Sequence, residues 1–117
     1  MIPFLPPRRL PALLLPCLLA TFPATASELP GRAALTMIGE VNGTALACQQ
    51  LAIVSRARNA VATTAPKTRE HGEIFEHATQ AAFLALGQGG ACPEATVLAE
   101  RLQTAEEALA RAFARQP

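Results

Sequence analysis

The chain has 117 residues, a formal net charge of +1 at neutral pH, and neither tryptophan nor tyrosine. A charge so close to zero provides no electrostatic attraction for nucleic acid or for an anionic membrane surface. The absence of tryptophan and tyrosine also removes most of the rings on which single-stranded nucleic acids stack. We therefore expect no nucleic-acid partner.

The first 26 residues, Met1–Ala26, have the pattern of an export signal that is removed. Arg8 and Arg9 supply the positive start, residues 10–22 are apolar, and Ala24-Thr25-Ala26 is a small-x-small cleavage site. The apolar stretch is about a dozen residues long, whereas a membrane-spanning helix needs roughly 20. We expect cleavage after Ala26, a periplasmic or secreted product and no stable membrane insertion.

Two other interpretations of this segment were weighed. Arg8-Arg9 could belong to a twin-arginine signal, but Leu10-Pro11 follows instead of the usual bulky apolar pair. Cys17 could be a lipid-anchoring cysteine, but Pro16 stands where a small residue is required. The simplest interpretation of Cys17 is an apolar residue of the signal.

Removal of the signal leaves two of the three cysteines, Cys48 and Cys92. In an oxidising compartment a single pair predicts one disulfide, and the alternative is two unlinked buried thiols. A cross-link closing a loop of this length is worth about 4 kcal/mol in the chain-entropy estimate. The signal carries two arginines and no acidic residue, so its loss lowers the formal net charge from +1 to −1.

The remaining chain is rich in alanine and has no aspartate, which favours helices over strands. Residues 27–43 are expected to form a flexible lead-in, with a possible short helix or turn over 33–38 and a turn at Asn42-Gly43. Thr44 would then open the helical domain, residues 44–117. The first helix should end near Thr63 or Thr64, because Pro66 disfavours helical geometry in the residue before it.

Two further helices are predicted. One runs from about Lys67 to Leu86 and ends at the following glycines, and the other starts at Cys92-Pro93-Glu94. Leu98, Leu102 and Leu109 repeat on one side of the last helix and predict its packing face. The predicted apolar stripe of the preceding helix consists of Ile74, Phe75, Ala78, Ala81, Ala82 and Ala85. The fold class is therefore all-α: a small antiparallel bundle of three main helices, clamped by one disulfide that joins the beginnings of two of them.

The most polar stretch of the chain is a flank formed by Glu70, Glu73 and His77, which share one helical stripe. Two carboxylates and an imidazole could hold a divalent metal, but the recognised zinc patterns are absent. An exposed, solvated flank explains the same spacing. His71 is expected to point elsewhere, and we expect no metal or other cofactor.

A candidate basic patch brackets the turn at Pro66. Its members are Arg56, Arg58, Lys67 and Arg69. They could face an anionic partner or simply solvate helix ends. Cations at a helix start are slightly unfavourable for the helix dipole, which supports the patch.

Catalysis is not expected. Ser27 and Ser55 are the serines that remain after signal cleavage, and no nucleophile-and-base motif surrounds the histidines. In layout, with a signal, a short helical chain and one disulfide, the protein resembles the periplasmic acid-stress chaperones of the HdeA type, a likeness that carries no shared motif. Immunity proteins and secretion-system accessory proteins share this layout.

The leading functional prediction is a non-enzymatic exported protein that binds another envelope protein. A chaperone-like or stress protein is the first alternative. A protein that binds a metal or small ligand through residues 67–77 is the second. The sequence leaves the oligomeric state open.

Overall fold

The computed structural model describes residue 3 and residues 29–114, and all of its regular structure is helical. The helices are α1 (Arg32–Ala47), α2 (Leu51–Thr64), α3 (Arg69–Gly87) and α4 (Ala95–Phe113). The all-α prediction is confirmed, but the described chain has four helices where three main helices were expected. The predicted export signal, residues 1–26, lies outside the described residues apart from Pro3.

The first half of the domain differs most from prediction. Asn42 and Gly43 form no turn, because α1 continues through both of them to Ala47. The chain turns later, at Cys48–Gln50, where Gln49 takes a left-handed conformation with φ of 58°. The Gln50 N–H closes the end of α1 by donating to the Ala45 carbonyl at 2.8 Å. Thr44 therefore lies inside α1 and does not start a helix.

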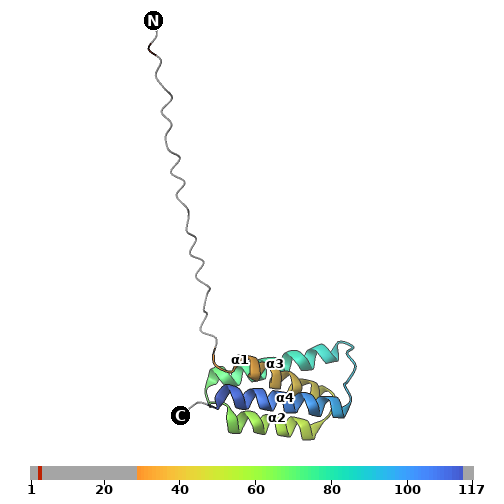
Figure 1. Ribbon diagram of the computed structural model, residues 1–117. Helices are drawn as coiled ribbons and strands as arrows, with labels where there is room; N and C mark the ends of the chain where they lie inside the picture. Colours follow the sequence, from red (N-terminus) through yellow and green to blue (C-terminus); the bar gives the residue numbers. More distant parts are fainter. Residues whose placement is uncertain (1–2, 4–28, 115–117) are drawn as a thin grey trace.

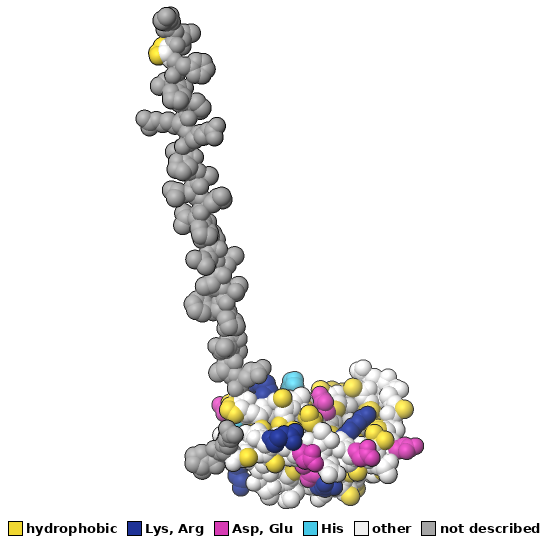
Figure 2. Space-filling view, viewed as in Figure 1, with side chains coloured by type: hydrophobic (Ala, Val, Ile, Leu, Met, Phe, Trp, Pro, Cys, Tyr) yellow, Lys and Arg dark blue, Asp and Glu magenta, His cyan; other side chains and the backbone are white. Residues whose placement is uncertain are grey.

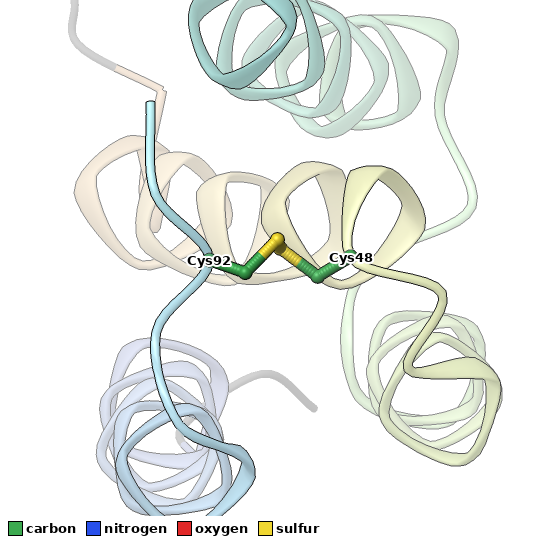
Figure 3. Close-up of a disulfide and its surroundings, with 2 residues drawn as sticks. All are labelled: Cys48 and Cys92. Carbon is green, nitrogen blue, oxygen red and sulfur yellow. A yellow bond between two sulfur atoms is a disulfide. The ribbon is translucent and has the colours of Figure 1, made fainter. Parts of the chain in front are cut away.

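Helix α1 is the centre of the molecule. It packs against α2, α3 and α4, and α2 also packs against α4. Helix α3 lies on one side of α1, and α2 and α4 lie on the other (Figures 1 and 3). Within residues 29–114, α3 has no extended packing with α2 or α4 and reaches them only through single side chains.

Large aliphatic side chains fill the side of α1 that faces α2 and α4. Leu98, Leu102 and Leu109 of α4 are completely buried, as predicted, and they share one core with Leu35 and Ile38 of α1. Burying a leucine or isoleucine contributes about 1.5–3 kcal/mol relative to leaving it exposed. This side of α1 therefore holds most of the hydrophobic core.

Small residues form the opposite contact, between α1 and α3. A Cβ added at Gly39 would lie 2.6 Å from the Ala78 Cβ and 2.7 Å from the Phe75 carbonyl oxygen, and one added at Gly43 would overlap the Thr79 carbonyl oxygen. The two glycines thus let the backbones of the two helices approach closely. This close approach explains why an Asn-Gly pair that predicts a turn lies inside a helix here.

The buried face of α3 is rotated from the predicted stripe. His71, Phe75, Ala78 and Thr79 are buried, whereas Ala81 and Ala85 are exposed. The side chain of Asn42 donates to Thr79 Oγ1 at 3.1 Å, and Thr79 Oγ1 donates to the Phe75 carbonyl at 2.8 Å. Alanine stripes are too uniform to specify which face of a helix turns inward, so contact with the glycines of α1 decides it.

His71, which was expected to point away, is only 7% exposed. Thr68 caps α3, because its Oγ1 accepts a hydrogen bond from the His71 backbone N–H at 3.3 Å and also hydrogen-bonds to the His71 Nδ1. The ring of His71 packs edge-on against Phe113 of α4, with ring centroids 5.6 Å apart. The start of α3 is thereby tied to the end of α4.

The predicted disulfide between Cys48 and Cys92 is present, with the Cα atoms 5.7 Å apart (Figure 3). Its position corrects the prediction, because Cys48 caps the end of α1 and does not lie early in a helix. Cys92 lies just before α4. The cross-link therefore holds the start of α4 against the end of α1, and α2 and α3 lie in the loop that it closes.

No helix among the described residues is long and apolar enough to cross a membrane.

Candidate functional site

A concave surface runs along the exposed side of α1, where one hollow lies between α1 and α3 and the next lies between α3 and α4 with α1 as its floor. It consists of two adjoining hollows with volumes of about 660 and 730 Å³. Both hollows are lined by Glu40, Ala82 and Ala85, so they form one continuous surface. We call this surface the α3–α4 groove.

The groove exists because α3 and α4 both pack along α1 but, within residues 29–114, share no extended packing with each other beyond the ring contact of His71 and Phe113. The glycine contacts draw α3 onto one side of α1, and the leucines of α4 pack on the other. One long side of α1 is then left without a covering helix, and α1 is seen there between α3 and α4 (Figure 1).

Most of the groove lining between the end of α3 and the first half of α4 is apolar. Met37 and Val97 are each 38% exposed, although large aliphatic residues of an amphipathic helix normally face a core. Leu86 and the shared alanines extend the same surface, whereas Val41, which also lines it, is only 5% exposed and belongs to the core. Figure 2 shows hydrophobic side chains lying among Lys, Arg and Glu side chains on this face of the molecule.

Charged groups line the groove and its rim. Glu40 lies where the two hollows meet, Glu70 and Glu73 line one hollow, and Glu100 lines the other. Only Glu73 among these carboxylates has an ion pair within residues 29–114, with Arg69 of its own helix at 3.0 Å. The cationic groups of the same lining are Arg32 and Arg101, so carboxylates outnumber guanidinium groups there.

The structure places the predicted polar flank on this surface. Glu70, Glu73 and His77 all line the first hollow, beside Arg32 of α1. No group of three or more His, Cys, Asp or Glu residues that could hold a metal ion occurs in the described part of the chain. The flank therefore contributes charge to a groove and does not assemble a ligand cage.

Three members of the candidate basic patch each pair with a carboxylate, and the fourth, Lys67, is exposed. Arg56 forms an ion pair with Glu106 of α4 at 2.5 Å, and Arg58 lies 3.9 Å from Glu76 of α3. Arg69 pairs with Glu73. These carboxylates balance much of the positive charge that the sequence concentrates around Pro66.

The centre of the groove was not predicted from the sequence. Met37 and Glu40 fall within residues 27–43, the predicted lead-in with a possible short helix or turn over 33–38, and the prediction gives Val97 no role. The sequence does carry a signal for this surface, because Met37, Val41 and Thr44 recur at helical spacing. A predicted helix that continued through Asn42 would have placed all three on one face.

Comparison of the chain with protein-family models, with curated protein sequences and with solved structures finds no match.

Proposed function

We propose that this protein is a small exported helical protein, without enzymatic activity, that binds another envelope protein through the α3–α4 groove. The observation that supports the proposal is the uncovered side of α1, where Met37 of α1 and Val97 of α4 are each 38% exposed and line a groove. Contiguous exposed apolar surface rimmed by polar residues is typical of protein interaction sites.

Export is supported by two features that are independent of each other. The N-terminal 26 residues have the charge, hydrophobic and cleavage pattern of a signal. The Cys48–Cys92 disulfide suits an oxidising compartment. Both fit a partner that is itself in the cell envelope.

Site-specific photo-crosslinking tests the proposal. A photoreactive amino acid is placed at Val97 or Ala85 in the groove, and at Ser55 or Ala62, which are exposed on α2, as matched controls. We expect one discrete cross-linked protein from the groove positions and none from the controls.

Equal cross-linking from both sets would contradict the groove as the binding site. A broad ladder of many clients that appears only in acid would instead favour the chaperone-like alternative. Absence of any cross-linked protein from either groove position would contradict protein binding through this surface.

A further inference from the structure

We infer that the segment recognised by the groove is a basic amphipathic helix lying along α3 over the exposed side of α1. This inference rests on the proposed function and adds the chemistry of the partner. Three properties of the groove carry it: its length, its apolar floor and its unpaired carboxylates.

The length suits a helix. Residues 70–86 of α3, which border the groove, extend for about 24 Å, and a helix of about 16 residues has the same length. The walls are themselves helices, so a bound helix would pack on α1 in the way that α3 and α4 already do. It would cover the long side of α1 that its neighbours leave open.

The floor supplies the hydrophobic contact. Met37 on the floor is 38% exposed, and Leu86 of α3 and Val97 of α4 add aliphatic surface on either side. Ala82 and Ala85 leave space beside them. Helix-in-groove recognition uses apolar side chains of the partner at i, i+3, i+4 and i+7, which enter such spaces. The flexible side chain of Met37 adapts to the shape of what enters.

The carboxylates of the groove favour a partner segment that carries positive charge. Glu40 lies at the middle of the apolar surface, and neither Glu40 nor Glu70 nor Glu100 has an ion-pair partner within residues 29–114. A lysine or arginine beside the apolar stripe of the partner would meet this charge. The same carboxylates disfavour a fatty acid or another anionic ligand in the groove.

Two synthetic peptides test the inference on the folded, disulfide-bonded protein. One is a fluorescent amphipathic peptide of about 16 residues with a leucine stripe flanked by lysines. The second peptide has the same sequence with glutamate at every lysine position. Fluorescence anisotropy titrations at low salt should show at least about tenfold tighter binding of the lysine peptide, and this preference should shrink as salt screens the charges.

Variants of Glu40 test whether its carboxylate causes the preference for the lysine peptide. Glu40→Gln should weaken binding of the lysine peptide by up to about fivefold, which is the upper range for an exposed charge pair. Glu40→Lys should weaken it further and improve binding of the glutamate peptide. Glu107→Gln is the matched control, because Glu107 is exposed on α4 but does not line the groove, and it should change neither affinity. Circular dichroism confirms that each variant is folded.

The outcomes separate this inference from the proposed function. Equal binding of both peptides, lost in Val97→Asp but unchanged in Glu40→Lys, would overturn the basic partner and leave helix binding by the groove intact. Failure of both peptides together with discrete photo-crosslinks from the groove would overturn the helical partner alone. Tighter binding of a fluorescent fatty acid than of the lysine peptide, or a stable dimer by sedimentation that buries Val97, would replace the basic helix with a lipid or with a second copy of this chain.

Discussion

Helix α1 makes two kinds of contact on its opposite sides. Toward α2 and α4 it presents Leu35 and Ile38, which interlock with the leucines of α4. Toward α3 it presents Gly39 and Gly43, over which the backbone of α3 passes closely. The first contact depends on the volume of side chains, and the second depends on their absence.

This difference determines how each side responds to mutation. A leucine core loses stability when volume is removed, because the cavity is only partly filled by relaxation. A glycine contact loses stability when volume is added, because the backbone of the neighbouring helix cannot move aside cheaply. Smaller side chains should therefore destabilise the leucine side of α1, and larger side chains should destabilise its glycine side.

The largest effect is expected on the leucine side. Leu102 is 0% exposed, so Leu102→Ala should lower the free energy of unfolding by about 2–5 kcal/mol. Leu51→Ala is the control, because Leu51 is 69% exposed and its truncation should cost less than about 0.5 kcal/mol. Urea denaturation followed by circular dichroism measures both. A loss below about 0.5 kcal/mol for Leu102→Ala would mean that the α4 face does not pack as described.

The disulfide reinforces the same side by joining the end of α1 to the start of α4. Replacing both cysteines with serine should lower stability by about 2–4 kcal/mol, mainly because the unfolded chain is no longer constrained. The wild-type protein in reductant should match the double variant. Full alkylation of the purified protein without reduction would show that the disulfide does not form.

On the glycine side, two Gly→Ala substitutions should change the free energy of unfolding in opposite directions. Gly43→Ala should destabilise by about 1–3 kcal/mol, because the new methyl group overlaps the Thr79 carbonyl oxygen. Gly72→Ala, in α3 with nothing within 4 Å of the added Cβ, should instead stabilise by about 0.5–1 kcal/mol. Thermal or urea unfolding of the two variants measures both changes in stability. Stabilisation by both substitutions would contradict the close approach of α1 and α3.

The smallest effect is expected from the buried hydrogen bond across the glycine contact. Asn42 donates to Thr79 Oγ1, and a double-mutant cycle with Asn42→Ala and Thr79→Ala should give a coupling of about 1 kcal/mol. The cycle cancels the separate costs of the two cavities. Strict additivity would show that the hydrogen bond does not stabilise the α1–α3 contact.

Much of the fold follows from local patterns. The alanine-rich composition, the leucine repeat of α4, the break at Pro66 and the pair of cysteines were each sufficient for a correct prediction. These features act through the local backbone preference of a residue, through one-sided spacing or through simple pairing, and all three can be read from a single sequence. The candidate site was predicted only at its rim, through Glu70, Glu73 and His77.

Tertiary structure decided the remainder. Asn42-Gly43 has the local preference of a turn, yet packing against α3 makes it part of a helix, because only glycine allows the backbones to come so close. The same contact selected the face of α3 that is buried and brought His71 inward. It also kept α3 apart from α4, which opened the groove over Met37 and Glu40. The sequence by itself determined the all-helical class, the approximate positions of α3 and α4 and the pairing of the cysteines. The extent of α1 and the groove depend on where the helices lie relative to one another, and no local pattern encodes that.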